Sequence, residues 1–561
     1  MDMIAAMRNY IDKIINDAAI AGMKALILDP VTAQIVSMVY SQTQILEKEV
    51  YLVELLGKRH ESMNHLKAAV FLQPTESNTQ LLLAEFLNPK FAEYHLFFSN
   101  IVPPDMLAQL ARGDENDVVR QVQEYYCDVL AINEDLFQLG VDNSLILSSP
   151  SSRTPKANVI FERNVQGVLS VLLALKRRPA QIRFQEKSEA ARRLATEVLG
   201  RIERDDIFDF RRQEGPLLLI LDRRDDPVTP LLTQWTYQAM VHELLGLNNN
   251  RVVLKGAPNI SKEMEEVVLS TTQDAFFAQN RYSNFGDLGS AVKSLLDAYQ
   301  DKAKMNDSIS SIEDMQAFME RYPAFRSHGI VAAKHVAIMG ELARLTDVCQ
   351  LLDISQLEQD MACSSDRSNH RRDLMAKIAS PRVEPADKVR LALLYILRYE
   401  NGDEAKQIKA HLIEHGVARE KAAYIDAMVA YAGENRRAPG LYSSGDSFIS
   451  KFSKAVVSSV NGIENVYTQH TPVLTSIMES FKGRLKDTQF PLVSAPDQSR
   501  PSDMIVFIIG GTTYEEAAKV AEFNAHNPSH KIILGGSCIH NSTSFLEELD
   551  DAFGSGASGK Y

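Results

Sequence analysis

The stretch Gly215–Gly246 constrains the fold most, because it combines an apolar run, a charged turn and an amphipathic helical pattern. Leu217–Leu221 is an unbroken apolar run, too short for a typical helix and bounded by Gly-Pro on one side and by charge on the other. Such a run predicts a strand that is covered on both faces, as in a parallel sheet. The chain is therefore expected to contain at least one buried α/β layer.

A turn and a helix are expected to follow this strand. Two prolines come shortly after it, and proline fixes φ near a helix start and cannot extend a ladder of strand hydrogen bonds. From Thr233 onward apolar residues recur at helical spacing, and Gly246 is placed to end that helix. Trp235, the only tryptophan, and Tyr237 lie near its start.

Asp222 and Asp226, at the carboxyl end of the strand, allow two interpretations. Carboxylates at this edge of a parallel sheet can hold Mg²⁺ or a ligand. Alternatively, both accept hydrogen bonds from turn and helix amides, and Arg223 pairs with them. The pattern of residues in this turn favours the structural interpretation of Asp222 and Asp226. A nucleotide- or metal-dependent hydrolase that uses residues 222–226 and glycine-pair loops remains the alternative.

Composition narrows the function classes. Sixty basic against seventy-three acidic residues give a net charge of −13, which argues against a protein that binds nucleic acid by neutralising phosphates. The four cysteines are far apart and form no C-x-x-C pair, so neither a disulfide framework nor a thiolate zinc site is expected. At 561 residues the chain should fold into about three or four domains, or fewer if one is split.

The amino terminus predicts an amphipathic docking helix and not a signal peptide, because charged residues interrupt its apolar face. No stretch reaches the roughly 18 apolar residues that a membrane span requires. We therefore expect a cytosolic protein that reaches membranes through partners.

Two α/β regions are expected, one of them split. Residues 24–130 alternate strands and helices, which predicts a parallel α/β domain, but a nucleotide-binding glycine loop is missing after the first strand. The second region continues to the opening stretch. Apolar strands near its end, Met504–Ile509 and Lys531–Leu534, need neighbours, so both ends of the chain should share one sheet. The middle is then a mostly helical insertion, with a Ser-rich loop or mobile helix at Ser443–Ser459.

Two motifs could carry chemistry. His411, Glu414 and His415 match H-x-x-E-H, in which two histidines one helical turn apart bind zinc, but Gly416 places the second histidine on a fraying last turn. Glycine pairs at 510–511 and 535–536 follow strands and could bind phosphate, but without a P-loop lysine they favour sharp turns and close packing. We expect no catalytic residue, metal or cofactor.

Three segments taken in order resemble the SM (Sec/Munc) family of syntaxin-binding chaperones for SNARE-driven vesicle fusion. They read DRRDDPVTPLLTQWTYQAM (222–240), FIIGGTTYEEA (507–517) and GGSCIHNSTSFL (535–546). The chain looks most like the vacuolar-protein-sorting branch, which acts at endosomes and the trans-Golgi network. The resemblance implies a protein without catalysis that binds a syntaxin-like SNARE, a vesicle SNARE and the assembled SNARE complex.

The resemblance also implies a three-domain arch: residues 1–126 as an α/β domain, 127–247 with 481–561 as a split α/β domain, and 248–480 as a helical domain. Binding sites follow by the same resemblance. An apolar pocket for the syntaxin amino-terminal peptide would comprise Leu107, Leu110, Val122 and Glu124, the two leucines lying one helical turn apart.

Further sites follow from the family pattern. A cavity for the SNARE core would use Asp29, Glu54 and Arg59. Pro323 falls in a helical hairpin that templates the vesicle SNARE, where it would break or bend a helix; an ordinary loop is the alternative. In this setting the opening stretch becomes a joint between domains, formed by Asp222, Arg223, Asp226, Trp235 and Tyr237.

Overall fold

The computed structural model describes residues 1–58, 61–210, 215–258, 260–306, 312–442, 467–493 and 500–554. The chain divides into two compact units. Unit 1 comprises Met1–Arg223, Met478–Thr512 and Lys519–Ile539, and unit 2 comprises Arg224–Ile477, Thr513–Ala518 and His540–Tyr561.

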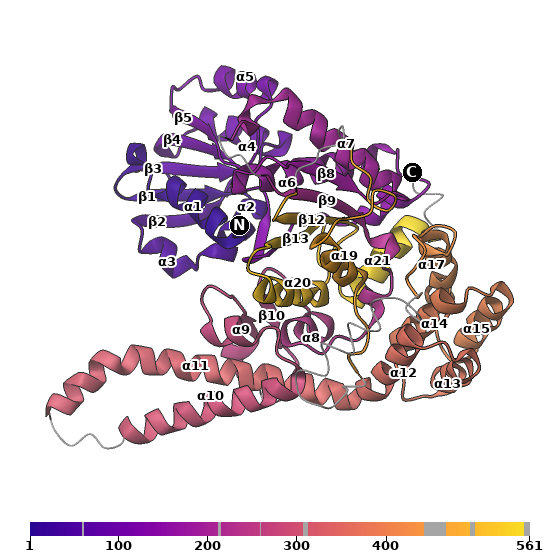
Figure 1. The fold of residues 1–561 in the computed structure, drawn as a ribbon. Coiled ribbons are helices and arrows are strands. Elements are labelled where there is room, and N and C mark those ends of the chain that lie inside the picture. Colours follow the sequence, from indigo (N-terminus) through magenta and orange to yellow (C-terminus); the bar gives the residue numbers. More distant parts are fainter. Residues whose placement is uncertain are drawn as a thin grey trace. The chain divides into compact units, whose positions relative to one another are not determined.

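Unit 1 begins with a five-stranded sheet whose strand order is β2-β1-β3-β4-β5, and every neighbouring pair is parallel. The parallel α/β prediction is confirmed here (Figure 1). The strands are β1 (Lys24–Leu28), β2 (Val50–Leu55), β3 (Met63–Leu72), β4 (Phe91–Phe98) and β5 (Val119–Glu124), and the helices are α1 (Met3–Ile15), α2 (Pro30–Val39), α3 (Gln42–Leu46), α4 (Glu76–Leu87) and α5 (Pro104–Gly113).

A second sheet of unit 1 joins strands from both ends of the chain, as the apolar runs predict. Its order is β6-β7-β13-β12-β9-β8, with β12 paired to β9 from Met504–Leu217 to Ile509–Asp222. Its strands are β6 (Leu130–Asn133), β7 (Leu136–Gln138), β8 (Gln181–Phe184), β9 (Leu217–Asp222), β12 (Met504–Ile509) and β13 (Ile532–Gly536), and the helices along this part of the chain are α6 (Pro155–Leu175), α7 (Glu189–Arg204) and α20 (Tyr514–His526).

One strand pair corrects the expectation of purely parallel sheets. β6 and β7 run antiparallel. Only Glu134 and Asp135 separate them, and so short a connection can join only antiparallel strands, whereas a parallel pair needs a long crossover.

Unit 2 is mostly helical, as predicted, but it also contains an antiparallel two-stranded sheet, β10 (Arg251–Val253) with β11 (Glu266–Val268), which the sequence pattern did not indicate. The helix α8 starts at Tyr237, four residues later than expected. The helices are α8 (Tyr237–Leu244), α9 (Ala275–Asn280), α10 (Phe285–Asn306), α11 (Ile312–Val348), α12 (Leu351–Cys363), α13 (Arg367–Ala379), α14 (Pro385–Tyr399), α15 (Gly402–Glu414), α16 (Arg419–Ala422), α17 (Tyr424–Ala432), α19 (Val473–Phe481) and α21 (Ser542–Phe553).

The long helices α10 and α11 lie side by side as a hairpin (Figure 1). The expected loop at Ser443–Ser459 lies outside the described residues. In the part of the chain that the structure describes, no helix is both long and apolar enough to cross a bilayer.

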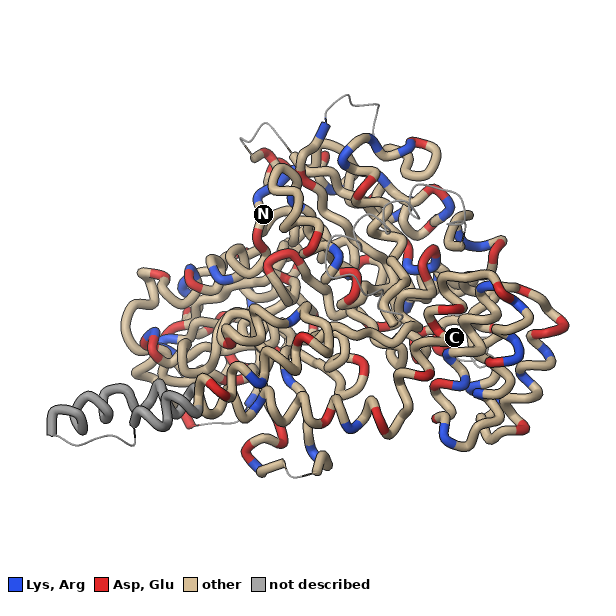
Figure 2. Tube along the Cα trace, turned by 60° about the horizontal axis from the view of Figure 1, so that its bottom comes forward, with Lys and Arg blue, Asp and Glu red and all other residues tan. Residues whose placement is uncertain are grey.

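Charges of both signs are interspersed along the trace (Figure 2). Many basic residues have an acidic partner close by, such as Arg192 with Glu189 and Arg201 with Glu197.

Candidate functional site

The acidic turn begins at Asp222, the last residue of β9, which is 4% exposed. Its carboxylate accepts hydrogen bonds from the hydroxyls of Ser148, at 2.9 Å, and Ser188, at 2.6 Å. Ser188 also caps α7. Arg223 is 1% exposed and its Nε donates to the carbonyl of Gly511 at 3.0 Å. These contacts hold the end of β9 inside unit 1, but through serine hydroxyls and the Gly511 carbonyl and not through the turn amides that the structural interpretation named.

Asp226, in unit 2, accepts three hydrogen bonds: from the N–H and the hydroxyl of Thr229, and from the N–H of Val473 at 3.0 Å. The neighbouring Asp225 accepts from the N–H of Ala438. Both carboxylates therefore satisfy backbone donors of segments that are distant in sequence. The expected use of Asp226 as a turn cap is confirmed.

Trp235 and Tyr237 anchor the start of α8 to other helices of unit 2. The indole N–H of Trp235 donates to the hydroxyl of Ser355 on α12, at 2.8 Å. The Tyr237 hydroxyl lies 2.7 Å from Nδ1 of His335 on α11, and Nε2 of His335 lies 2.9 Å from the carboxylate of Asp274. Because a carboxylate accepts, Nε2 carries the proton and Nδ1 accepts from the tyrosine.

Burial governs the protonation of this cluster. His335 is completely buried, and desolvation lowers its pKa below the ordinary 6.5 even though Asp274 opposes the shift. Desolvation alone would raise the pKa of Asp274, but its contacts with His335 and Lys334 outweigh burial and bring the pKa below its ordinary value. The pair is thus a neutral histidine beside an ionised aspartate near neutral pH.

We expect the free energy of unfolding of unit 2 to fall at acid pH because of this cluster. Below pH 6.5 the unfolded chain binds a proton at His335 that the folded chain does not bind. The contribution of His335 to the free energy of unfolding is therefore present above that pH and is lost as the pH falls, by up to about 1.4 kcal/mol per pH unit. Asp274 adds a further loss of stability at pH values below the ordinary pKa of aspartate, where the unfolded chain binds a proton that the folded chain does not. Urea unfolding of wild type and His335→Gln at pH 7.5 and 5.5 measures the effect.

The His335→Gln chain should be less stable at pH 7.5 and should show a shallower decline on acidification. His526→Gln is the control, because His526 is exposed on α20. An equal pH slope in all three chains would contradict the role assigned to His335.

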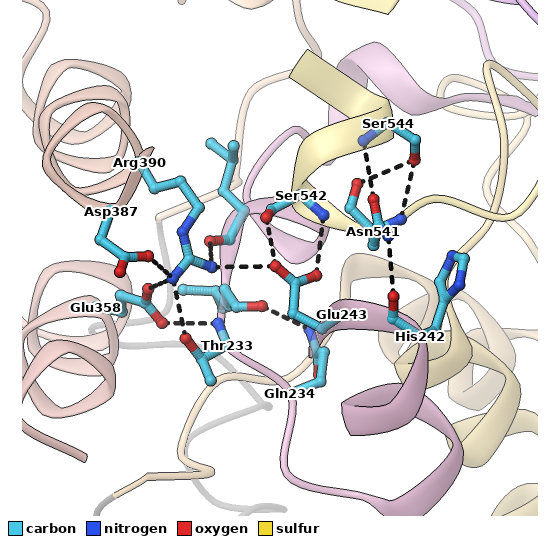
Figure 3. Close-up of polar contacts among 12 residues, drawn as sticks. Thr233, Gln234, His242, Glu243, Glu358, Asp387, Arg390, Asn541, Ser542 and Ser544 are labelled. Carbon is cyan, nitrogen blue, oxygen red and sulfur yellow. Dashed lines mark hydrogen bonds and ion pairs between the residues drawn. The ribbon is translucent and has the colours of Figure 1, made fainter. Parts of the chain in front are cut away.

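The most connected buried charge in unit 2 is Arg390 on α14, which is 4% exposed (Figure 3). Its guanidinium lies 2.7 Å from the carboxylate of Asp387, 3.0 Å from Glu358 and 3.5 Å from Glu243. Glu358 in turn accepts from the N–H of Thr233 at 2.7 Å. One arginine therefore links α8, α12, α14 and the segment that leads into α8.

Burial raises the pKa of Glu358, and Arg390 only partly opposes the shift. Burial also disfavours the charge on Arg390, but the surrounding carboxylates outweigh it and raise its pKa above the ordinary value. The guanidinium is thus held charged. Sequence patterns did not identify this group as a site. The available signal was an arginine directly before the apolar run Leu391–Leu397, because a charge that is buried in a helix requires an acidic partner.

The same network reaches α21. Glu243 accepts from the N–H of Ser542 at 3.0 Å and from its hydroxyl, and the amide of Asn541 donates to the carbonyl of His242 at 2.9 Å (Figure 3). A small hollow opens beside these residues, with Tyr514 in its wall. Asn541 and Ser542 of the third family-like segment are therefore tied to the end of α8, just after the first segment.

The first glycine pair precedes α20, and the amino end of this helix has an internal acceptor. At the amino end of α20, where a phosphate would bind, the carboxylate of Glu516 accepts from the N–H of Thr513 at 2.9 Å and from its hydroxyl. Gly510 and Gly511 have φ of 82° and 89°, which favours glycine. A negative carboxylate already occupies the donors that a phosphate would need.

The structure separates the four residues predicted for the amino-terminal peptide. Leu107 on α5 and Val122 on β5 are 38% and 41% exposed, but Leu110 is 4% exposed and packs in the core of the first sheet. Glu124 accepts from the N–H of Val102 at 2.7 Å and from the hydroxyl of Tyr126. The two leucines therefore do not share one accessible face. Of the four residues, Leu107 and Val122 are the exposed ones.

The residues predicted for the SNARE cavity also differ in exposure. Asp29 is 3% exposed, and its carboxylate caps α2 and accepts from the N–H of Gln73 at 2.6 Å and the amide of Asn78 at 2.8 Å. The structure gives Asp29 an internal capping role in place of a surface contact. Glu54 is half-buried on β2, an edge strand, and Arg59 lies outside the described residues.

Pro323 lies within α11, which continues from Ile312 to Val348, so the proline does not end the helix. The expected position in a helical hairpin agrees with the pairing of α10 and α11. The surroundings of the Pro323 side chain lie outside the described residues.

Comparisons with known proteins cover nearly the whole chain. Residues 24–548 match the Sec1 family. The vacuolar protein sorting-associated protein 45 of Dictyostelium discoideum is 44% identical over 554 residues, which are 98% of this chain and 96% of the relative. The mouse protein of the same name is 43% identical over 557 residues, 98% of this chain and 96% of the relative.

Among solved structures, the SM protein Vps45 in complex with the Qa SNARE Tlg2 (1-310) is similar, with a TM-score of 0.89 and 40% identity. The match covers 99% of this chain and 98% of that one. The fold class expected from the sequence, α/β with a helical insertion, is confirmed by this likeness. The chain belongs to the Sec1 family, the SM proteins.

Proposed function

We propose that this chain is an SM-type chaperone that binds a syntaxin-like Qa-SNARE and promotes assembly of the SNARE complex for vesicle fusion. The observation that supports it most is the likeness, over nearly the whole chain, to a Vps45 protein solved together with a Qa SNARE. We further propose that it acts at endosomal, trans-Golgi or vacuolar membranes, which it reaches through its partners. Binding surfaces, and no catalytic step, carry this function.

We propose the domain division 1–126, 127–247 with 481–561, and 248–480. The strands β1–β5 lie in the first range, and β6–β9, β12 and β13 lie in the second, which supports the first boundary. In the third range, α10 and α11 with Pro323 are the proposed template for a vesicle SNARE, and the two helices contact each other. Joint residues Asp222 and Asp226 would hold the segments that lead into this range.

The proposed surface for the syntaxin amino-terminal peptide is centred on Leu107 and Val122. Both side chains are exposed, and β5 is an edge strand of its sheet. An edge strand offers backbone donors and acceptors to an extended peptide, and exposed apolar side chains give specificity. Two residues support this surface from inside. Leu110 packs α5 into the core of the first sheet, and Glu124 accepts a hydrogen bond from the N–H of Val102, two residues before α5 begins.

Leu107→Arg should lower the affinity for the amino-terminal peptide of the cognate Qa-SNARE at least tenfold, because it places a charge in the apolar contact. Folding should be unaffected since the side chain is exposed. Fluorescence anisotropy with a labelled peptide measures the change. Leu87→Arg is the matched control, because Leu87 is an exposed leucine of the same unit. Equal peptide affinity in both variants would contradict the assignment.

A pull-down with SNARE cytoplasmic domains tests the function itself. The full chain should retain a Qa-SNARE cytoplasmic domain, and removal of the SNARE amino-terminal peptide should weaken retention. A liposome fusion assay should then show faster SNARE assembly with the chain present. If no Qa-SNARE of the endosomal and Golgi set is retained, the proposal is wrong.

A further inference from the structure

The carboxyl end of α15 contains two histidines and a glutamate whose outward atoms converge. His411 and His415 are one helical turn apart, and Glu414 lies between them. One nitrogen of each ring and one carboxylate oxygen all lie within 4.8 Å of one another. His415 is the C-cap residue, directly after the last helical residue Glu414, and its N–H donates to the carbonyl oxygen of His411 at 3.1 Å; Gly416 follows with φ of 86°.

The hydrogen bonds of His411 and His415 show which of their ring nitrogens have a free lone pair. Nδ1 of His415 lies 3.0 Å from the carbonyl oxygen of His411, and Nε2 of His411 lies 3.4 Å from the carbonyl oxygen of Met375 on α13. A carbonyl oxygen only accepts, so both of these nitrogens carry protons. In the neutral rings, Nε2 of His415 and Nδ1 of His411 then have free lone pairs. Metal-binding histidines commonly hold their second nitrogen in this way.

The free lone pair of His411 faces a carboxylate. Nδ1 of His411 lies 3.6 Å from Oε2 of Glu414. Two electron-rich atoms at this distance repel each other unless a proton or a cation lies between them. Two ligands of a tetrahedral zinc ion, with bonds of about 2.0–2.2 Å, are about 3.4 Å apart, so this separation already suits a shared ion.

We propose that His411, Glu414 and His415 bind one Zn²⁺ ion at the carboxyl end of α15. Two imidazole nitrogens favour zinc over Mg²⁺ or Ca²⁺, which prefer oxygen ligands. The Glu414 side chain is 75% exposed, so the ion is accessible from solvent and water completes its coordination. Bound zinc would fix the last turn of α15 beside α13.

Zinc titration of the full chain tests this site. After treatment with a chelator, wild-type protein should bind one more equivalent of Zn²⁺ than His415→Gln or His411→Gln, measured by competition with a chromogenic indicator. The affinity of this equivalent should be at least tenfold lower in either variant. Co²⁺ in place of zinc should give the visible absorption of a tetrahedral site in wild type only.

His526→Gln is the matched control. Nδ1 of His526 lies 2.8 Å from the carbonyl oxygen of Glu522, the same contact four residues back that His415 makes, but His526 belongs to none of the candidate metal-binding groups among the described residues. This variant should bind zinc as wild type does. If His411→Gln and His415→Gln keep the full stoichiometry and affinity, the site does not exist, and a protonated His411 paired with Glu414 explains the geometry.

Discussion

Arg390→Met should lower the free energy of unfolding of unit 2 by about 3–5 kcal/mol, the cost of removing one partner from a buried ionic group. The methionine fills a similar volume but leaves the carboxylates of Asp387, Glu358 and Glu243 facing one another without their cation. Denaturation followed by the fluorescence of Trp235 measures the loss, because this is the only tryptophan and it bonds to α12 beside Glu358.

Two further chains make this test specific. Arg372→Met removes an arginine that is 70% exposed and paired with Asp373, and it should leave the unfolding transition unchanged. The double variant Arg390→Met with Glu358→Met should be less destabilised than the sum of the two single variants, because a buried charge is removed together with its partner. Additive losses would show that Arg390 stabilises unit 2 by packing and not by pairing.

The contrast between local and distant contacts explains which features the sequence could predict. Leu217–Leu221 signals a buried strand by its own composition, and β9 occupies Leu217–Asp222. By contrast β5, VRQVQE, is an edge strand with only two apolar residues, which are not adjacent, and no continuous apolar run marks it. A strand that is buried on both faces has a continuous apolar sequence and can be predicted from it. An edge strand lacks this pattern and is harder to predict.

Site residues depend even more on distant partners. Leu107 and Leu110 look equivalent at helical spacing, but the sheet beneath α5 buries only the second. Likewise, the spacing around Arg390 indicates only Asp387, three residues earlier, while Glu358 and Glu243 come from α12 and α8. A charge pattern shows that a buried arginine needs partners, but only the fold determines which acids they are.

Gly535→Ala should destabilise unit 1 by about 1–3 kcal/mol or more, the usual cost of overpacking a core. A Cβ at this position would lie 1.9 Å from the ring of Phe137, far inside van der Waals contact. The ring cannot easily move, because Phe137 is 1% exposed and stacks on Phe507. Thermal unfolding followed by circular dichroism measures the loss.

Gly402→Ala is the control, since a Cβ there meets no atom within 4 Å, and this chain should melt as wild type does. Phe137→Leu combined with Gly535→Ala should recover part of the stability by making room for the methyl group.

Thermal unfolding also distinguishes close packing at the glycine pairs from phosphate binding there. Inorganic phosphate should leave the wild-type melting temperature unchanged, whereas a phosphate site at the glycine pairs requires it to rise with concentration. Because Glu516 already accepts from Thr513 at the amino end of α20, we expect packing to explain both glycine pairs.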